Sequence, residues 1–88
     1  MNADSRPVVN SHFRLQWEKT QQAWVLLYPE GMVKLNGSAG EILCRCDGSR
    51  SIDGLVAELE AAFAATGLRN DVVAFLDHAA QQRWVRLA

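Results

Sequence analysis

The sequence predicts an α+β fold of winged-helix-like architecture, in which a three-stranded antiparallel sheet is followed by three helices. Three observations support this class. Apolar residues alternate with polar ones near the start of the chain, at Phe13, Leu15 and Trp17. A Pro-Glu-Gly turn then joins two short apolar runs at hairpin spacing. In the second half, apolar residues instead recur every three or four positions, which is the period of a helix.

We expect three strands, over residues 12–18, 23–28 and 32–35. The alternation in the first strand places its apolar side chains on one face. The second strand is apolar enough to be covered on both faces. Pro29 presets φ for a turn position and Gly31 accepts a positive φ, so the chain can reverse between the second and third strands without strain. Short turns between consecutive strands make the sheet an antiparallel meander.

Three helices are expected after the third strand. The first runs from about residue 38 to residue 46, and Ser38 and Glu41 have the spacing of a capping box. The second starts at Ser51, and Gly67 is placed to close it. The third starts near residues 70–71, and the residues from Trp84 onward continue it or form a short strand. The apolar stripes are Ile52, Leu55, Val56, Leu59, Ala62 and Phe63 in the second helix and Val72, Val73, Leu76, Ala79 and Ala80 in the third.

The length of 88 residues suffices for one domain with a single core. Residues 1–10 are polar and contain Pro7, so we expect a flexible N-terminal arm there and a single domain over residues 11–88. Nine Lys and Arg against ten Asp and Glu leave no basic excess to attract nucleic acid or an anionic membrane. No signal peptide and no apolar run of the roughly 20 residues that span a bilayer are present, which predicts a cytoplasmic location.

The candidate catalytic groups do not form a recognisable set. Cys44 and Cys46 lie two positions apart on the first predicted helix, where their side chains diverge by about 200°. This spacing favours neither a disulfide nor a tetrahedral metal site, and we interpret the pair as one buried and one surface thiol. The only histidines are His12 and His78, and Asp77 beside His78 does not face it on a helix. The sequence therefore predicts no catalytic residue and no metal ligand.

A winged-helix-like fold raises the alternative of a DNA-binding regulator. Recognition helices present Arg, Lys, Asn or Gln to base edges. The second predicted helix instead carries Asp53, Glu58 and Glu60 without a basic residue, and Arg83 and Arg86 come only at the far end of the third. DNA binding is therefore disfavoured. A small thiol enzyme is a third interpretation, which depends on the two cysteines alone.

Two runs of residues closely resemble the PqqD family, the small peptide chaperones of pyrroloquinoline quinone (PQQ) biosynthesis. They are LLYPEGMVKLNGSAGEIL at 26–43 and DGSRSIDGLVAEL at 47–59. The likeness extends from about residue 7 through the third predicted helix, with the elements in the same order. Several words in a fixed order are far more specific than one short motif.

The resemblance implies a stand-alone recognition element that binds the precursor peptide PqqA by strand addition and presents it to the radical-SAM enzyme PqqE. Such a protein would catalyse nothing and hold no cofactor, since the iron–sulfur clusters and S-adenosylmethionine would belong to the enzyme. The peptide would lie between the third strand and the third helix. The expected peptide-binding residues are therefore Met32, Val33, Lys34 and Leu35 on the strand and Val73, Leu76, Asp77, Ala80 and Trp84 on the helical wall.

Two questions about the open strand edge stay undecided by the sequence. Lys34 either discourages aggregation, as charged residues on edge strands do, or pairs with an acidic side chain of the peptide. The same edge can also pair with a second copy of the chain. We therefore expect that a homodimer can form at high concentration, by edge pairing or by exchange of the N-terminal strands.

Overall fold

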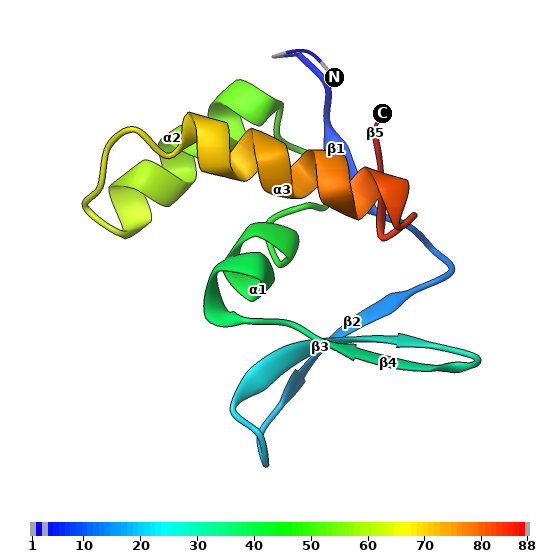
Figure 1. Cartoon of the computed structure of the whole chain (residues 1–88). Helices are drawn as coiled ribbons and strands as arrows, with labels where there is room; N and C mark the ends of the chain where they lie inside the picture. The colour runs from blue at the N-terminus through cyan, green and yellow to red at the C-terminus, as the bar shows by residue number, and fades with distance from the viewer. Residues whose placement is uncertain (1, 3, 88) are drawn as a thin grey trace.

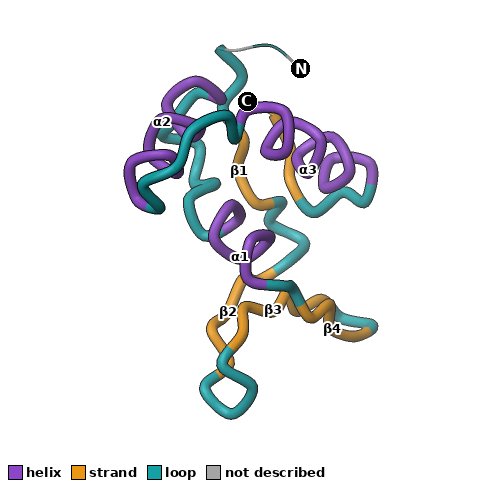
Figure 2. The backbone as a smooth tube through the Cα atoms, turned by 60° about the vertical axis from the view of Figure 1, so that its left-hand side comes forward, coloured by secondary structure: helices purple, strands orange, loops and turns teal. Residues whose placement is uncertain are grey.

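The computed structural model describes residues 2 and 4–87, which form an α+β fold with three helices and two small antiparallel sheets (Figure 1). The sheet β2–β3–β4 forms one end of the molecule, and α2, α3 and the sheet β1–β5 form the other, with α1 between them (Figure 1, Figure 2). The sequence predicts this class correctly. In chain order the elements are β1 (Pro7–Val9), β2 (Arg14–Glu18), β3 (Ala23–Tyr28), β4 (Gly31–Lys34), α1 (Gly37–Leu43), α2 (Ile52–Ala62), α3 (Arg69–Gln81) and β5 (Val85–Leu87).

The three-stranded sheet is the antiparallel meander that the turns predict, with β3 in the centre. Leu15 of β2 and Val33 of β4 both pair with Leu26, so apolar side chains of all three strands share one face. α1 packs against this face at Gly40. A Cβ atom at Gly40 would overlap the side chain of Trp24, so only glycine allows the helix to approach the sheet this closely.

The hydrophobic core lies between the β2–β3–β4 sheet and the three helices. Each fully buried leucine contributes about 1.5–3 kcal/mol of transfer free energy relative to an exposed one. The buried residues of this cluster are Leu26, Leu35, Ala39, Ile42, Leu43, Cys46, Ile52, Leu55, Val56, Leu59, Val72, Leu76, Ala79 and Val85.

The capping box that the sequence predicts at the N-terminus of α1 is wrong. Asn36 is the N-cap, and its Oδ1 atom accepts a hydrogen bond of 2.8 Å from the backbone N–H of Ala39. The Ser38 hydroxyl donates to the same Oδ1 atom at 3.1 Å, so it supports the cap instead of forming it. Asn is as good an N-cap as Ser. Glu41 is left to form an ion pair of 2.9 Å with Arg45, one turn further along the chain.

The start of α2 is as predicted, but its end is not. The Ser51 hydroxyl accepts a hydrogen bond of 3.2 Å from the backbone N–H of Gly54, which confirms the expected cap. The apolar stripe is buried only as far as Leu59, whereas Ala62 and Phe63 are exposed. Residues beyond Leu59 therefore gain little core contact that would favour a longer helix.

Ala64, not Gly67, occupies the left-handed position that ends α2. Its φ is +50°, and the backbone N–H of Ala65 donates to the carbonyl of Glu60 at 2.9 Å. The Ala64 N–H donates to the carbonyl of Ala61 at 3.4 Å, which completes a Schellman motif. Gly67 also has a positive φ, of +73°, but it lies in the loop that leads to α3.

The chain ends in strand β5, which pairs antiparallel with β1. Residues 7–9 therefore form a strand where the sequence predicts a flexible arm, and residues 1 and 3 of that arm lie outside the described residues. The pairing is reinforced from the segment after α1, since Val9 N–H donates to the carbonyl of Cys46 at 3.0 Å and Gly48 N–H donates to that of Pro7 at 3.1 Å. Among the described residues, no helix combines the length and the apolar character needed to cross a membrane.

Candidate functional site

β4 lies at the edge of its sheet, and within residues 2 and 4–87 no strand pairs with its outer side. The backbone N–H of Leu35 donates to the carbonyl of Trp24 at 3.0 Å. Hydrogen-bonded and non-hydrogen-bonded positions alternate along an antiparallel pair. The backbone groups of Val33 and Leu35 are thus directed toward β3, and those of Met32 and Lys34 away from it. The outer edge therefore offers two residues' N–H and C=O groups to an added strand.

The side chains of β4 divide between the two faces of the sheet. Val33 is half-buried and Leu35 is buried against the core. Met32, which is 47% exposed, and Lys34 lie on the opposite face, where they pair with Leu27 and Val25 of the neighbouring strand. The accessible part of this edge therefore combines an apolar side chain with a positive charge.

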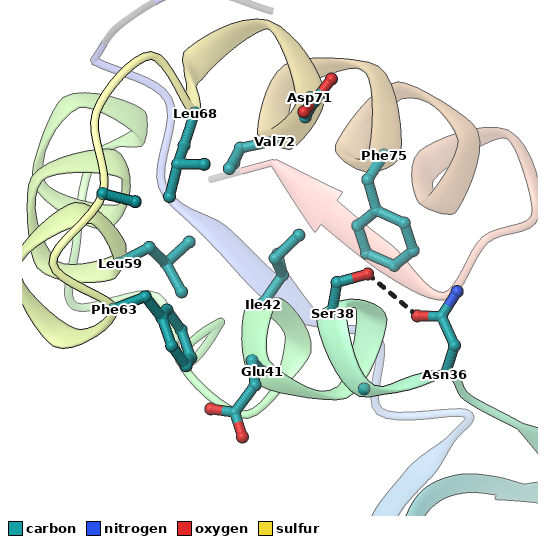
Figure 3. Close-up of a pocket in the computed structure, with 12 residues that line it drawn as sticks. Asn36, Ser38, Glu41, Ile42, Leu59, Phe63, Leu68, Asp71, Val72 and Phe75 are labelled. Carbon is teal, nitrogen blue, oxygen red and sulfur yellow. Dashed lines mark hydrogen bonds between the residues drawn. The ribbon is translucent and has the colours of Figure 1, made fainter.

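A cavity of about 650 Å³ lies between α1, the end of α2, the loop after α2 and the first half of α3 (Figure 3). Its lining begins two residues after β4, because Asn36, which lines it, directly follows Leu35. Its volume falls within the usual range for ligand pockets. Apolar side chains form most of the wall, and we call the polar lining residues the rim. The apolar residues are Ile42, Leu59, Phe63, Ala65, Leu68, Val72 and Phe75, the polar ones are Asn36, Ser38, Glu41 and Asp71, and Gly37 completes the lining.

Two phenylalanines bound the cavity on opposite sides (Figure 3). Phe63, at the end of α2, is 51% exposed, and its ring lies 5.9 Å from the guanidinium carbon of Arg45. Phe75, on α3, is half-buried and lies with its ring centroid 6.5 Å from that of Trp84. A large aromatic side chain that stays exposed in the wall of an apolar cavity is typical of a binding surface.

The charge at the cavity rim is acidic. Glu41 is paired with Arg45, whose Nε atom also lies 3.3 Å from Oε2 of Glu58. The Nε atom of Arg50 lies 2.9 Å from the same oxygen. The arginines next to the cavity are thus neutralised by carboxylates, and Asp71 forms no ion pair with another described residue. The rim therefore favours a positively charged group.

Comparison with known proteins identifies the family. The model of "Coenzyme PQQ synthesis protein D (PqqD)" matches residues 23–85. The chain is 46% identical over 82 residues to the PqqA binding protein of Stutzerimonas stutzeri (strain A1501), a match that covers 92% of this chain and 89% of that protein. It is 49% identical over 85 residues to the PqqA binding protein of Pseudomonas aeruginosa (strain UCBPP-PA14), covering 96% and 92%. The chain belongs to the PqqD family.

Solved structures of PqqD proteins share this fold. PqqD of Xanthomonas campestris is 32% identical and superposes with a TM-score of 0.58, covering 98% of both chains. The PqqD part of Methylobacterium extorquens PqqCD, a stand-alone recognition element for ribosomally made, modified peptides, has a TM-score of 0.78 at 24% identity, covering 98% of this chain and 93% of that one. The region that the PqqD model matches contains β4 and every residue that lines the cavity.

The structure brings only some of the sequence-predicted site residues together. Met32, Val33 and Lys34 form the accessible edge, whereas Leu35 and Leu76 belong to the core of this PqqD-family protein. The remaining residues of the expected helical wall do not lie together on one side of α3. On a helix, Val73, Asp77 and Ala80 lie roughly 140–160° around the axis from Phe75, and none of the three lines the cavity. Trp84 does not line it either, but its ring packs against that of Phe75.

None of the residues that line the cavity is among the peptide-binding residues expected from the sequence, and the accessible or half-buried side chains missed in this way include Phe63, Asp71 and Phe75. Phe63 continues the apolar stripe of α2, so its period predicts a core residue. Phe75 lies beside the stripe of α3, and its size was a usable signal, because a bulky aromatic next to a complete stripe widens the apolar face on that side.

The surroundings of the cysteines and histidines indicate structural roles and not catalytic ones. Cys46 is buried, which raises the pKa of its thiol to about 12, and Cys44 is exposed, so the expected buried and surface pair is confirmed. The pKa of Cys44 is also raised, mainly by partial desolvation, so neither thiol is activated as a nucleophile. His12 packs on Phe13 and His78 on Trp84. No group of three or more His, Cys, Asp or Glu side chains suited to a metal ion occurs in the described part of the chain.

Proposed function

We propose that this protein binds a PqqA-like precursor peptide as an added strand on β4 and presents it to a radical-SAM enzyme of the PqqE kind. The observation that carries the proposal is the free outer edge of β4 next to an apolar cavity. The relatives named PqqA binding protein support the choice of peptide. Strand addition draws its affinity from backbone hydrogen bonds and its selectivity from side-chain pockets, and this surface offers both.

The proposed peptide contacts follow from the geometry of the edge. The backbone groups of Met32 and Lys34 pair with the peptide, and the Lys34 ammonium group interacts with an acidic peptide side chain. Val33, Leu35 and Leu76 are half-buried or buried, and they support the peptide-binding surface from the core side. Phe75 and Trp84 form the helical wall in place of Val73, Asp77 and Ala80, which face another flank of α3.

In this proposal the protein acts by binding and orientation, without a catalytic role, in the cytoplasm. The iron–sulfur clusters and S-adenosylmethionine belong to the enzyme. The unpaired edge of β4 also allows two copies of the chain to associate at high concentration, by edge pairing or by exchange of N-terminal strands. Peptide and second copy would then compete for the same edge.

An NMR titration of labelled protein with synthetic PqqA peptide tests the proposal. We expect the largest amide shifts at residues 32–35, with smaller shifts along the Phe75 and Trp84 side of α3. The outer strand β2 serves as an internal control, because its residues should shift little. If a saturating peptide moved no amide in β4, the proposed function would be wrong for the isolated protein.

A further inference from the structure

The cavity beside β4 has a role that strand addition leaves unexplained. The residues whose backbone would pair with a peptide, Met32 and Lys34, do not line it. We propose that the cavity binds one or two bulky apolar side chains of the precursor peptide, from the segment just N-terminal to the added strand, and that its acidic rim binds a neighbouring basic residue. This inference rests on the proposed function and adds a second recognition element to it.

The position of the cavity selects the N-terminal side of the peptide. Both strand pairs of the sheet are antiparallel, and we take the added strand to continue that pattern. β4 runs from Gly31 toward Lys34 and is followed by Asn36, the first residue that lines the cavity. An antiparallel peptide therefore has its N-terminal end beside Lys34. Residues that precede the paired segment reach the cavity, and residues that follow it leave toward the β3–β4 turn.

The chemistry of the wall selects apolar side chains. Figure 3 shows Ile42, Leu59, Leu68 and Val72 around the space, with Phe63 on one side. Phe63 is 51% exposed in the unbound protein, so a side chain that enters the cavity removes water from its ring as well. Burial of apolar surface on both partners favours binding. The apolar side chains of the wall cannot form hydrogen bonds with a polar side chain, so burial of a polar peptide segment there is disfavoured.

The charge of the rim selects a basic neighbour. Glu41 on α1 and Asp71 on α3 line the cavity from opposite sides (Figure 3). Arg45 already neutralises part of the charge on Glu41, whereas Asp71 forms no ion pair with another described residue. A Lys or Arg side chain next to the apolar anchor would meet Asp71 at the surface. Lys34 gives the β4 edge the opposite charge, so a peptide with a basic N-terminal segment and an acidic strand segment matches the surface in one direction only.

The test compares two peptides on three proteins. The peptides are full-length synthetic PqqA and a version that lacks the residues N-terminal to the segment that pairs with β4, as located by the NMR titration. The proteins are the wild type, Phe63→Ser and Trp17→Ser. Trp17 is a matched control because it is 47% exposed and lies on β2, outside the cavity. Dissociation constants are measured by calorimetry, and amide spectra verify that each variant is folded.

We expect the wild type and Trp17→Ser to bind the full-length peptide about tenfold more tightly than the shortened one, as for a buried interface anchor. Phe63→Ser should bind both peptides nearly equally, at the level of the shortened peptide. If the wild type binds both equally, or if Phe63→Ser keeps the advantage of the longer peptide, the cavity proposal is overturned while strand addition stands. If the wild type binds neither peptide, the proposed function itself fails.

Discussion

The two outer edges of the three-stranded sheet make an instructive comparison. β2 and β4 flank β3 on either side, and within the described residues neither has a partner on its outer side. β2 is the longer of the two, with five residues against four, and it carries the exposed aromatic Trp17. By backbone hydrogen bonding alone, either edge would accept an added strand.

What distinguishes the two edges is their surroundings. β4 leads within two residues to the N-cap of α1, Asn36, which lines an apolar cavity, whereas β2 leads into the exposed β2–β3 turn. An edge supplies affinity that hardly depends on sequence, so a neighbouring pocket is needed to select a particular peptide. β2 begins directly after Phe13, which lines a smaller cavity of about 380 Å³ whose other lining residues, Asn10, His12, Gln82 and Arg83, are polar. The larger cavity with its mostly apolar wall, and not the free edge, is therefore what makes β4 the better candidate.

The largest expected effect concerns the central strand on which both edges depend. Gly40→Ala should lower the free energy of unfolding by about 1–3 kcal/mol, because its methyl group would overlap Trp24 of β3. Gly37→Ala is the matched control on the same helix, since a Cβ there meets no atom within 4 Å. Urea unfolding measures both. Equal stability of the two variants would mean that α1 does not hold the sheet as described.

A proline on each edge tests the comparison directly. Met32→Pro removes an N–H that points away from β3, so the sheet keeps its own ladder while the peptide loses a donor and meets the ring. We expect peptide affinity to fall about tenfold. Trp17→Pro makes the corresponding change on β2 and should leave affinity nearly unchanged. The opposite ranking, measured by calorimetry on variants with folded amide spectra, would assign the peptide to β2.

Charge reversal at the β4 edge distinguishes the two interpretations of Lys34. Lys34→Glu should weaken peptide binding roughly three- to fivefold at low salt, and less at high salt, if the ammonium group meets an acidic peptide side chain. Lys19→Glu, in the turn between β2 and β3, is the control for net charge. If the affinity were unchanged and self-association increased, Lys34 would have only its edge-protecting role. Analytical ultracentrifugation measures the self-association.

The smallest expected effect concerns the rim of the cavity. Asp71→Asn should weaken binding of the full-length peptide about twofold at low salt, since an exposed ion pair is worth only a few tenths of a kcal/mol. The shortened peptide should be unaffected. Asp77→Asn, on the opposite flank of α3, serves as the control. A larger loss with Asp77→Asn than with Asp71→Asn would return the binding surface to the flank that the sequence favours.

Local patterns predicted the class of fold and most elements, because strand alternation, the Pro29–Gly31 turn and the Ser51 cap each act over a few residues. These patterns failed where two residues close in sequence both suit the same position in a helix cap. Asn36 and Ser38 both suit an N-cap, and Ala64 adopts a positive φ that the sequence assigns to Gly67, because the core ends at Leu59. The β1–β5 pairing joins residues almost 80 positions apart, and three-residue strands are too short to show a period.

The candidate site was only half predictable for a related reason. The β4 edge follows from the order of three short strands, so its residues could be named from the sequence. The helical wall depends on which flank of α3 faces α1, and a stripe fixes only the centre of the buried face. Val73 and Phe75 lie on either side of that centre at Val72 and Leu76. Only the packing of α1 and the loop after α2 decides between them.

The pairing of β1 with β5 has a practical consequence for how this protein can be attached to other molecules. It brings residues 7–9 and 85–87 together at the end of the molecule opposite the β2–β3–β4 sheet (Figure 1). A fused domain, an affinity tag or a tether to a sensor surface can therefore be added at either terminus without covering β4. A linker of a few flexible residues should suffice at both ends, and the two fusion orders should capture peptide equally well.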